Sequence, residues 1–164
     1  SLDRARDLAK PPAHILGFGF GNRLTGWFAE ENMMTTGAKE AGETAYRMAG
    51  IGPKDVDTAQ IYDCFTHMVL LQLEDYGFCK KGEGGPFAAS GVLEPGGALP
   101  TNTSGGQLSE GHVEGMLQIL EGARQVRHEY GPDRQVTSAE IALVTGHGGN
   151  TVCQSALILG RQTS

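Results

Sequence analysis

Apolar residues along the chain follow two periods, one typical of strands and one typical of helices. Short apolar runs rich in strand formers are expected to be strands, at residues 13–20, 58–62, 139–144 and 151–159. Helical spacing predicts helices at residues 35–49, 65–76 and 110–129, after a frayed or helical lead-in over residues 1–10. Strands that alternate with helices predict an α/β fold, in which a mixed sheet carries helices on both faces.

Polar residues and glycines mark the ends of these elements. Thr35 and Thr36 are candidate N-caps of the first long helix, and Gly50 is its expected stop. Asp63 is expected to cap the second helix. A short glycine-rich turn over residues 145–150 joins the last two strands, so these are expected to pair as an antiparallel edge of the sheet.

The third helix carries an apolar stripe that predicts its buried face. Its members recur at helical spacing: Val113, Met116 or Leu117, Leu120, Ala123, and Val126 or Arg127. Glu121, Arg124 and Arg127 fit a solvated face. Ahead of this helix, residues 78–99 contain two prolines and paired glycines, and predict a long loop of the kind that is usually functional or mobile.

Composition restricts the class of protein. A chain of 164 residues predicts one domain, residues 1–164, and the lack of an initiator Met predicts a piece of a longer protein. The net charge of -6, without a basic block, disfavours nucleic acid and membrane surfaces as partners. No apolar run reaches the ~20 residues of a membrane span, and the start lacks the apolar centre of a signal peptide. Three cysteines without C-x-x-C spacing favour free, packed thiols in a reducing, cytoplasmic compartment: Cys64, Cys79 and Cys153.

Two familiar binding patterns do not fit this chain. Gly17, Gly19 and Gly21 form G-x-G-x-G and not the G-x-G-x-x-G of a dinucleotide site, and no predicted helix follows them directly. No set of His, Cys and carboxylate residues has the spacing of a metal site. The sequence therefore predicts neither a bound nucleotide cofactor nor a metal.

Polar residues concentrate in three turns at strand or helix ends, over residues 62–65, 102–115 and 146–150. Ligands of α/β sheets gather at such ends. The second turn places His112 at the start of the third helix, where the positive end of the dipole disfavours imidazolium and leaves a neutral general base. The alternative is a polar loop, capped by Ser109, with a solvated His112. His147 lies in the third turn, so the two histidines could share one pocket.

The order of these motifs resembles the C-terminal half of the thiolase superfamily. N-T-S-G-G-x-L-S-x-G-H at 102–112 is similar to its histidine-bearing motif, in the branch of sterol-carrier-type and lipid-transfer-protein thiolases. Y-D-C-F at 62–65 resembles that branch's counterpart of the N-E-A-F motif, and residues 71–85 are also similar to it. The T-G-H-G-G turn at 145–149 falls where thiolases carry C-x-G. The resemblance covers nearly the whole chain and implies one thiolase-like α/β half.

The resemblance implies acyl-CoA chemistry, with the CoA thioester as substrate and no bound cofactor. A cysteine of the N-terminal half attacks the thioester, and the histidine matching His112 activates that cysteine and helps to bind the thioester oxygen. Tyr62 and His147 join His112 as expected catalytic residues. Six further residues of the same turns are expected to bind substrate: Asn102, Ser104, Gly105, Gly111, Gly148 and Gly149. The main expectation is therefore acyl transfer on a 3-ketoacyl-CoA.

Three departures from the family pattern favour alternatives. The N-terminal half and its nucleophile are absent, so this chain alone is expected to be inactive; Tyr62 replaces the N-E-A-F asparagine; and no cysteine occupies the C-x-G turn. These changes are compatible with branch members that resemble aldolases and cleave a β-hydroxyacyl-CoA steroid side chain together with an OB-like, DUF35-type partner. Tyr62 is then the acid/base, or alternatively a strand-end residue that packs its ring.

A further alternative is a non-catalytic thiolase fold that binds CoA esters or a partner. The superfamily resemblance also implies a homodimer or a higher oligomer, and it implies association with the N-terminal half of the same protein. The loop over residues 78–99 is expected to bind a partner or the acyl chain.

Overall fold

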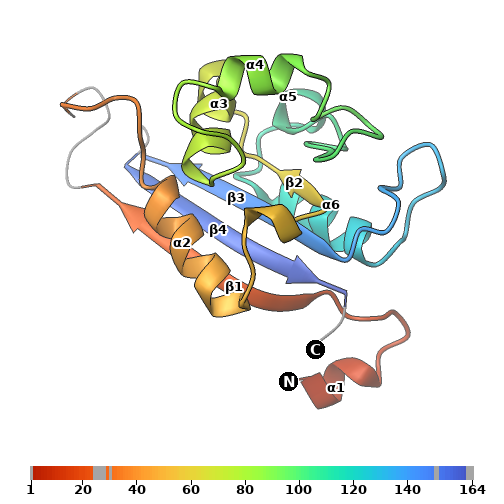
Figure 1. Ribbon diagram of the computed structural model, residues 1–164. Helices are drawn as coiled ribbons and strands as arrows, with labels where there is room; N and C mark the ends of the chain where they lie inside the picture. Colours follow the sequence, from red (N-terminus) through yellow and green to blue (C-terminus); the bar gives the residue numbers. More distant parts are fainter. Residues whose placement is uncertain (1, 24–28, 30, 150–151, 162–164) are drawn as a thin grey trace.

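In the part of the chain that the structure describes, four strands form one mixed sheet in the order β1-β4-β3-β2 (Figure 1). They are β1 (His14–Asn22), β2 (Thr58–Gln60), β3 (Ile141–Gly148) and β4 (Cys153–Gly160). The computed structural model describes residues 2–23, 29, 31–149 and 152–161. β4 pairs antiparallel with both β1 and β3, whereas β2 runs parallel to β3. The predicted mixed sheet is confirmed.

The predicted pairing of the last two strands is confirmed, but their predicted place at the edge of the sheet is wrong. β4 lies inside, because β1 pairs along its other side. β3 also continues through His147 to Gly148, so most of the turn expected over residues 145–150 is strand. Asn150, the last residue of that expected turn, lies outside the described residues.

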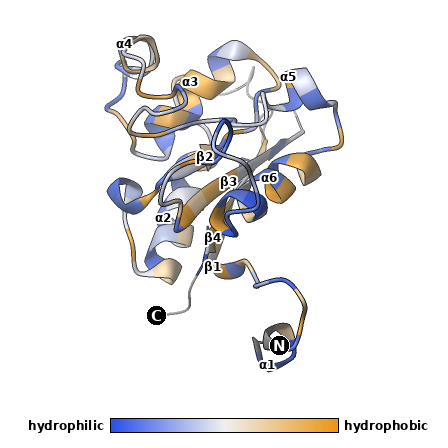
Figure 2. Ribbon diagram, turned by 90° about the vertical axis from the view of Figure 1, so that its right-hand side faces the viewer, coloured by the Kyte–Doolittle hydropathy of each residue, from blue (hydrophilic) through white to orange (hydrophobic). Residues whose placement is uncertain are grey.

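Helices cover both faces of the sheet (Figures 1 and 2). The described helices are α1 (Leu2–Arg6), α2 (Ala38–Ala49), the 3-10 turn η2 (Pro53–Asp55), α3 (Thr66–Asp75), α4 (Gly84–Ala89), α5 (Gln107–Glu110) and α6 (Met116–Val126). α2 packs on β1 and β4 and contacts α3, while α6 lies on the opposite face against β3 and β2. Each face has its own apolar core: Leu73 and Ile158 belong to the larger one, and Val144 and Leu159 to the smaller one under α6.

Glycines of β1 set the distance between this strand and α2. A Cβ at Gly17 would lie 2.3 Å from the carbonyl oxygen of Ala45, and one at Gly19 would lie 1.9 Å from that of Ala41. The helix backbone therefore rests directly on the strand, and the G-x-G-x-G pattern serves this close packing. The opposite face of β1 carries exposed apolar side chains, Ile15, Phe18 and Phe20. The prediction of a buried strand is thus right for one face only.

Gly50 ends α2 as expected, but the N-cap is Gly37, and the prediction that Thr35 or Thr36 caps the helix is wrong. The Thr36 hydroxyl accepts a hydrogen bond from the N–H of Ala38 at 3.1 Å, and Gly50 ends the helix with a φ of 71°. The hydroxyls of Thr35 and Thr36 also donate to the buried carboxylate of Asp75, at the end of α3. The segment before α2 is therefore tied to α3 on the same face of the sheet.

The helix predicted over residues 110–129 is shorter and corresponds to α6 alone, and its predicted buried stripe is wrong. Val126 is buried as expected, but Val113, Met116 and Leu120 are exposed. Glu121, expected in solvent, is only 2% exposed. The buried face of α6 consists mainly of polar residues and glycine: Gln118, Glu121, Gly122, Gln125 and Val126. Gly122 allows this side to approach the sheet, since a Cβ there would lie 2.6 Å from Cγ2 of Val144.

The loop predicted over residues 78–99 contains α4 and is packed against the protein. Phe87, Val92 and Leu93 contact the larger core, and the N–H of Leu99 donates to the carbonyl of Val92. This segment is therefore an integral part of the fold. Its expected role in binding a partner or an acyl chain stays a prediction.

Candidate active site

The three side chains predicted to be catalytic lie together. Tyr62 follows β2, and His147 lies near the end of β3; the parallel pairing of these strands brings both residues to the carboxyl-terminal side of the sheet. The Tyr62 hydroxyl lies 3.1 Å from Nε2 of His112. The centroids of the Tyr62 and His147 rings are 5.6 Å apart. Tyr62 is therefore the common neighbour of both imidazoles.

Hydrogen bonds to its main chain hold Tyr62 in place. Its N–H donates to the hydroxyl oxygen of Thr145 at 2.9 Å, and its carbonyl accepts from the side-chain amide of Gln72 at 2.8 Å. The Thr145 hydroxyl donates in turn to Oε1 of Gln72 at 2.7 Å. These buried bonds connect β3, α3 and the end of β2 without using the phenol, which remains available for chemistry.

Ile61, the residue before Tyr62, is fixed by two further side chains. Its carbonyl accepts from the Gln118 amide at 2.6 Å, and its N–H donates to Oδ1 of Asn102 at 2.7 Å. Asn102 has a φ of 50°, which asparagine tolerates better than most residues. Asn102 therefore holds the chain beside Tyr62 through its side-chain oxygen, and its predicted contact with substrate stays a prediction.

Asp63 does not cap α3, as was predicted, but binds the start of α5. α3 begins without a side-chain cap, and Oδ1 of Asp63 accepts the N–H of Gln107 at 3.0 Å. Gly106 makes this contact possible, since its φ is 68° and a Cβ there would lie 2.2 Å from the Asp63 carboxylate. This bond joins the Tyr62 segment to the glycine-rich stretch that carries the histidine.

The other residues predicted to bind substrate lie along two turns. Ser104 and Gly105 precede α5, and the Ser104 hydroxyl accepts a main-chain N–H of that turn. Gly111 ends α5 with a φ of 120°. Gly148 is the last residue of β3, and Gly149 follows it with a φ of 58°. Their contacts with substrate remain predictions.

His112 lies between α5 and α6, and not in the first turn of a helix as was predicted. α6 begins at Met116, after Gly115 with a φ of 84°. The helix-dipole argument for a neutral imidazole therefore does not apply to His112. The side chain is exposed in this chain, but its bond to Tyr62 distinguishes it from a merely solvated histidine. Ser109 lies within α5 and does not cap α6.

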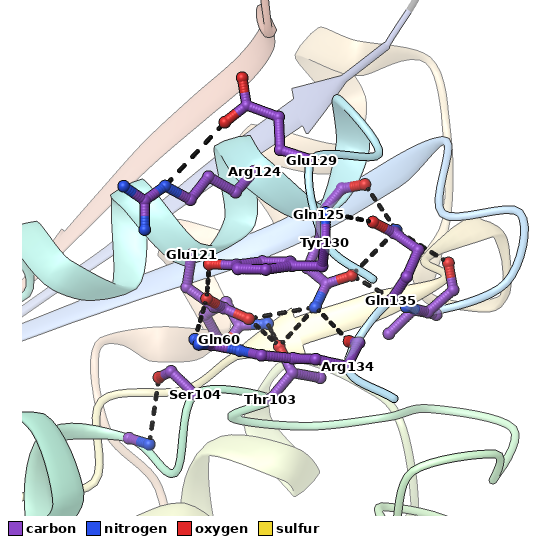
Figure 3. Close-up of polar contacts among 12 residues, drawn as sticks. Gln60, Thr103, Ser104, Glu121, Arg124, Gln125, Glu129, Tyr130, Arg134 and Gln135 are labelled. Atoms are coloured by element: carbon purple, nitrogen blue, oxygen red, sulfur yellow. Dashed lines mark hydrogen bonds and ion pairs between the residues drawn. The ribbon is translucent and has the colours of Figure 1, made fainter. Parts of the chain in front are cut away.

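A buried polar network anchors the stretch at residues 102–112 (Figure 3). The Thr103 hydroxyl donates to Glu121 of α6. It accepts hydrogen bonds from the side-chain amides of Gln60 and Gln125, both at 3.1 Å. All hydrogen-bonding capacity of the hydroxyl is therefore used. This pattern fixes the glycine-rich stretch against both β2 and α6.

Glu121 is the centre of the same network. Its carboxylate lies 2.6 Å from the guanidinium of Arg134 and also accepts from the Tyr130 hydroxyl. The guanidinium carbon lies 4.3 Å from the centroid of the Tyr130 ring, a cation–π arrangement (Figure 3). A buried charge that is paired and hydrogen-bonded is tolerated in a protein interior. The network thus explains why the sheet-facing side of α6 is polar.

Burial sets the protonation states of the site. Burial raises the pKa of the Tyr62 phenol, and the negative charges of Glu114 and Asp63 act in the same direction. Burial lowers the pKa of His147, against a smaller opposing effect of the Gln154 amide that bonds its Nδ1 at 2.7 Å. Tyr62 therefore remains a phenol near pH 7, and His147 a neutral imidazole.

The lowered pKa of His147 predicts a pH dependence of stability. An unfolded histidine, with a pKa of about 6.5, binds a proton more tightly than this partly buried ring. The free energy of unfolding is therefore expected to fall as the pH drops below about 6.5. His147→Asn, which keeps a polar group beside Gln154, is expected to reduce that decline in urea titrations of the full-length protein. An unchanged pH dependence in the variant would contradict the prediction.

The site opens into a cavity of about 410 Å³. Its lining consists of Tyr62, Asp63, Cys64, Phe65, Gln107, Leu108 and His112. Burial raises the pKa of the Cys64 thiol, which keeps it protonated and makes it a poor nucleophile. The cavity can therefore hold a substrate beside the phenol–imidazole pair, while its own thiol is unsuited to covalent catalysis.

Sequence reasoning missed the residues that position the catalytic side chains: Gln72, Gln118, Thr145 and Gln154. For Gln118 a signal existed, because it begins a polar stripe with Glu121, Gly122 and Gln125 at the spacing i, i+3, i+4, i+7. Gln72, Thr145 and Gln154 had no comparable signal, since each acts on a residue distant in sequence or on another strand.

The described ranges contain no group of three or more His, Cys, Asp and Glu residues that is placed to hold a metal ion. No helix within those ranges has the length and apolar character needed to cross a membrane. The three cysteines are free and half-buried.

Fold and site together define a thiolase-like domain. The chain belongs to the thiolase C-terminal domain-like family, whose model matches residues 23–161. The family resemblance predicted from the sequence motifs is thus confirmed.

Among individual relatives, a steroid side-chain-cleaving aldolase of Thermomonospora curvata is 42% identical over 98% of this chain and 41% of its own length. A 17-hydroxy-3-oxo-4-pregnene-20-carboxyl-CoA lyase of Mycobacterium tuberculosis is 40% identical over 98% of this chain and 42% of its own. A solved Ltp2-ChsH2(DUF35) aldolase superposes with a TM-score of 0.89 and 40% identity, over 96% of this chain and 42% of that chain. The chain therefore spans about two fifths of the length of these proteins.

Proposed function

We propose that this chain is the C-terminal catalytic half of a thiolase-like enzyme that cleaves a β-hydroxyacyl-CoA by a retro-aldol reaction. The observation that carries the proposal is the hydrogen bond between the Tyr62 hydroxyl and Nε2 of His112. A phenol–imidazole pair can move a hydroxyl proton, which retro-aldol cleavage requires. The names of the two relatives, an aldolase and a CoA lyase, support this activity better than acyl transfer, the main expectation from the sequence.

In the proposed reaction, the Tyr62 oxygen takes the proton of the substrate β-hydroxyl while its own proton passes to Nε2 of His112. The β-oxygen then forms a carbonyl, the bond between the α and β carbons breaks, and the electron pair moves into the enolate of the thioester. The proton held by the pair returns to the α carbon. A carbonyl product and a shortened acyl-CoA leave without any net gain or loss of protons. His147, neutral and against Tyr62, helps to hold the phenol.

The preceding half of the same protein is the proposed partner of the exposed side of α6. Met116 and Leu120 of this helix are exposed, and so are Phe18 and Phe20 of the edge strand β1. Exposed apolar patches of this kind are typical of interfaces. The relatives are more than twice as long as this chain, so they contain the polypeptide that such an interface needs.

A DUF35-type, OB-fold subunit is the second proposed partner. It is supported by the similarity of this chain to the Ltp2-ChsH2(DUF35) aldolase. A homodimer or higher oligomer and a cytoplasmic location remain predictions from the sequence.

Turnover by the full-length protein with its DUF35-type partner tests the proposed function. We expect carbonyl product to form from a β-hydroxyacyl-CoA, and no thiolysis of a 3-ketoacyl-CoA by free CoA. His112→Ala is expected to slow cleavage about 100-fold, because Tyr62 loses its proton acceptor. His14→Ala, in β1 and outside the site, serves as the matched control and should retain the wild-type rate.

Two results would overturn this proposal. Thiolysis without cleavage would identify the protein as an acyltransferase. Wild-type cleavage by the His112→Ala protein would remove His112 from the mechanism.

A further inference from the structure

Gln107 lines the cavity and carries two polar side-chain atoms without a hydrogen-bond partner in the described ranges. Its Oε1 and Nε2 are both shielded from solvent and lack a hydrogen-bond partner among the described residues. Gln60, Gln118 and Gln154 each lack a partner at the oxygen only, and each donates through its nitrogen. Buried polar groups in native proteins are nearly always paired, so a wholly unpaired amide requires an explanation.

The main chain of Gln107 is fixed at the point where its side chain begins. Its N–H is held by Asp63 at 3.0 Å, and the left-handed conformation of Gly106 sets the direction of the chain. The side chain lines the same cavity as Tyr62 and His112. The amide is close enough to the Tyr62 phenol to oppose the rise of its pKa that burial causes, although it does not reach hydrogen-bond geometry.

The chemistry of an amide limits what Gln107 can do. A carboxamide does not titrate near neutral pH, so it is no acid or base, but its nitrogen donates two hydrogen bonds. Retro-aldol cleavage needs such a donor at the thioester oxygen, where the negative charge of the enolate collects. Tyr62 and His112 already bind each other and serve the β-hydroxyl. The side-chain nitrogen of Gln107, which lines the same cavity, is a donor without a partner in the described part of the chain.

We infer that Nε2 of Gln107 donates a hydrogen bond to the thioester oxygen of the bound acyl-CoA and stabilises the charge that develops on it. This inference rests on the proposed function and adds a residue to it. Bound substrate then provides the partner that the amide lacks in the free protein.

Gln107→Met, measured in the full-length protein with its DUF35-type partner, tests the inference. Methionine has a similar length and volume but no donor, so kcat should fall about 100-fold while KM changes far less, because the bond strengthens in the transition state. Gln107→Glu places a negative charge beside the enolate and should be slower still. Glu110→Gln, an exposed position of the same short helix, is the matched control and should match the wild type.

The results distinguish failure of the inference from failure of the proposed function. A Gln107→Met enzyme with wild-type kcat overturns the inference and leaves retro-aldol cleavage intact. If the wild-type protein does not cleave β-hydroxyacyl-CoA, the proposed function fails, and equilibrium binding of butanoyl-CoA decides the inference. Gln107→Met should then weaken binding about fivefold, the effect of one hydrogen bond, and unchanged affinity overturns it.

Discussion

Tyr62→Phe is expected to lower kcat for β-hydroxyacyl-CoA cleavage about 1,000-fold, within the range for loss of a general acid–base group. The variant lacks only the hydroxyl that bonds Nε2 of His112 at 3.1 Å. The main-chain bonds of this residue to Thr145 and Gln72 do not involve that hydroxyl, so the ring should keep its place. Steady-state kinetics of the full-length protein with its DUF35-type partner measure the effect, and a thermal melt checks the fold.

Tyr46→Phe is the matched control for this substitution. Its hydroxyl lies away from the site and donates to the carbonyl of Tyr76, in the larger core. The control should lower the free energy of unfolding by about 1 kcal/mol and leave kcat unchanged. Comparable kcat values for Tyr62→Phe and the wild type would show that Tyr62 only packs its ring at the strand end.

Glu121→Leu is expected to lower the free energy of unfolding of the full-length protein by about 3 kcal/mol. Loss of one member of a buried ionic network typically costs 3–5 kcal/mol, and roughly the lower bound applies because Arg134 can still reach solvent. Thr103, Tyr130 and Gln125 also lose hydrogen-bond acceptors on this carboxylate. Urea unfolding followed by circular dichroism measures the change.

Glu129→Gln provides the matched control for Glu121. Glu129 forms ion pairs with Lys10, Arg124 and Arg127, whose side chains reach solvent. Such surface pairs contribute roughly 0–1 kcal/mol each, so the control should remain close to the wild type. If Glu121→Leu also remains within about 1 kcal/mol of the wild type, the network does not hold the glycine-rich stretch in the way its bonds indicate.

The order of the main elements could be predicted from the sequence, because strand and helix periods are local. A few neighbouring residues are enough to predict that Gly50 ends α2 and that β4 pairs with β3. The inner position of β4 could not be predicted, because it depends on β1, more than a hundred residues away. The role of Asp63 was missed for the same reason: its partner is the N–H of Gln107, 44 positions along the chain.

The site was predictable as a set of residue types but not as a geometry. His112 and His147 could be selected because each lies in a polar, glycine-rich turn, and Tyr62 because it lies in the Y-D-C-F motif that carries the family resemblance. Their contacts depend on the parallel pairing of β2 with β3 and on the buried bonds that hold the main chain of Tyr62. The amide of Gln107 had no local signal, since its significance is the lack of a partner inside a cavity that only the fold creates.

α6 shows most clearly what the sequence determined by itself and what only the tertiary structure decided. Its sequence contains two stripes at the same helical spacing, an apolar one with Met116, Ile119 and Leu120 and a polar one with Gln118 and Glu121. The sequence alone determines that the segment is a helix with two unlike sides. The tertiary structure turns the polar stripe toward the sheet, because Thr103 and the carbonyl of Ile61 satisfy its hydrogen bonds there. The apolar stripe is thereby left on the surface of this chain.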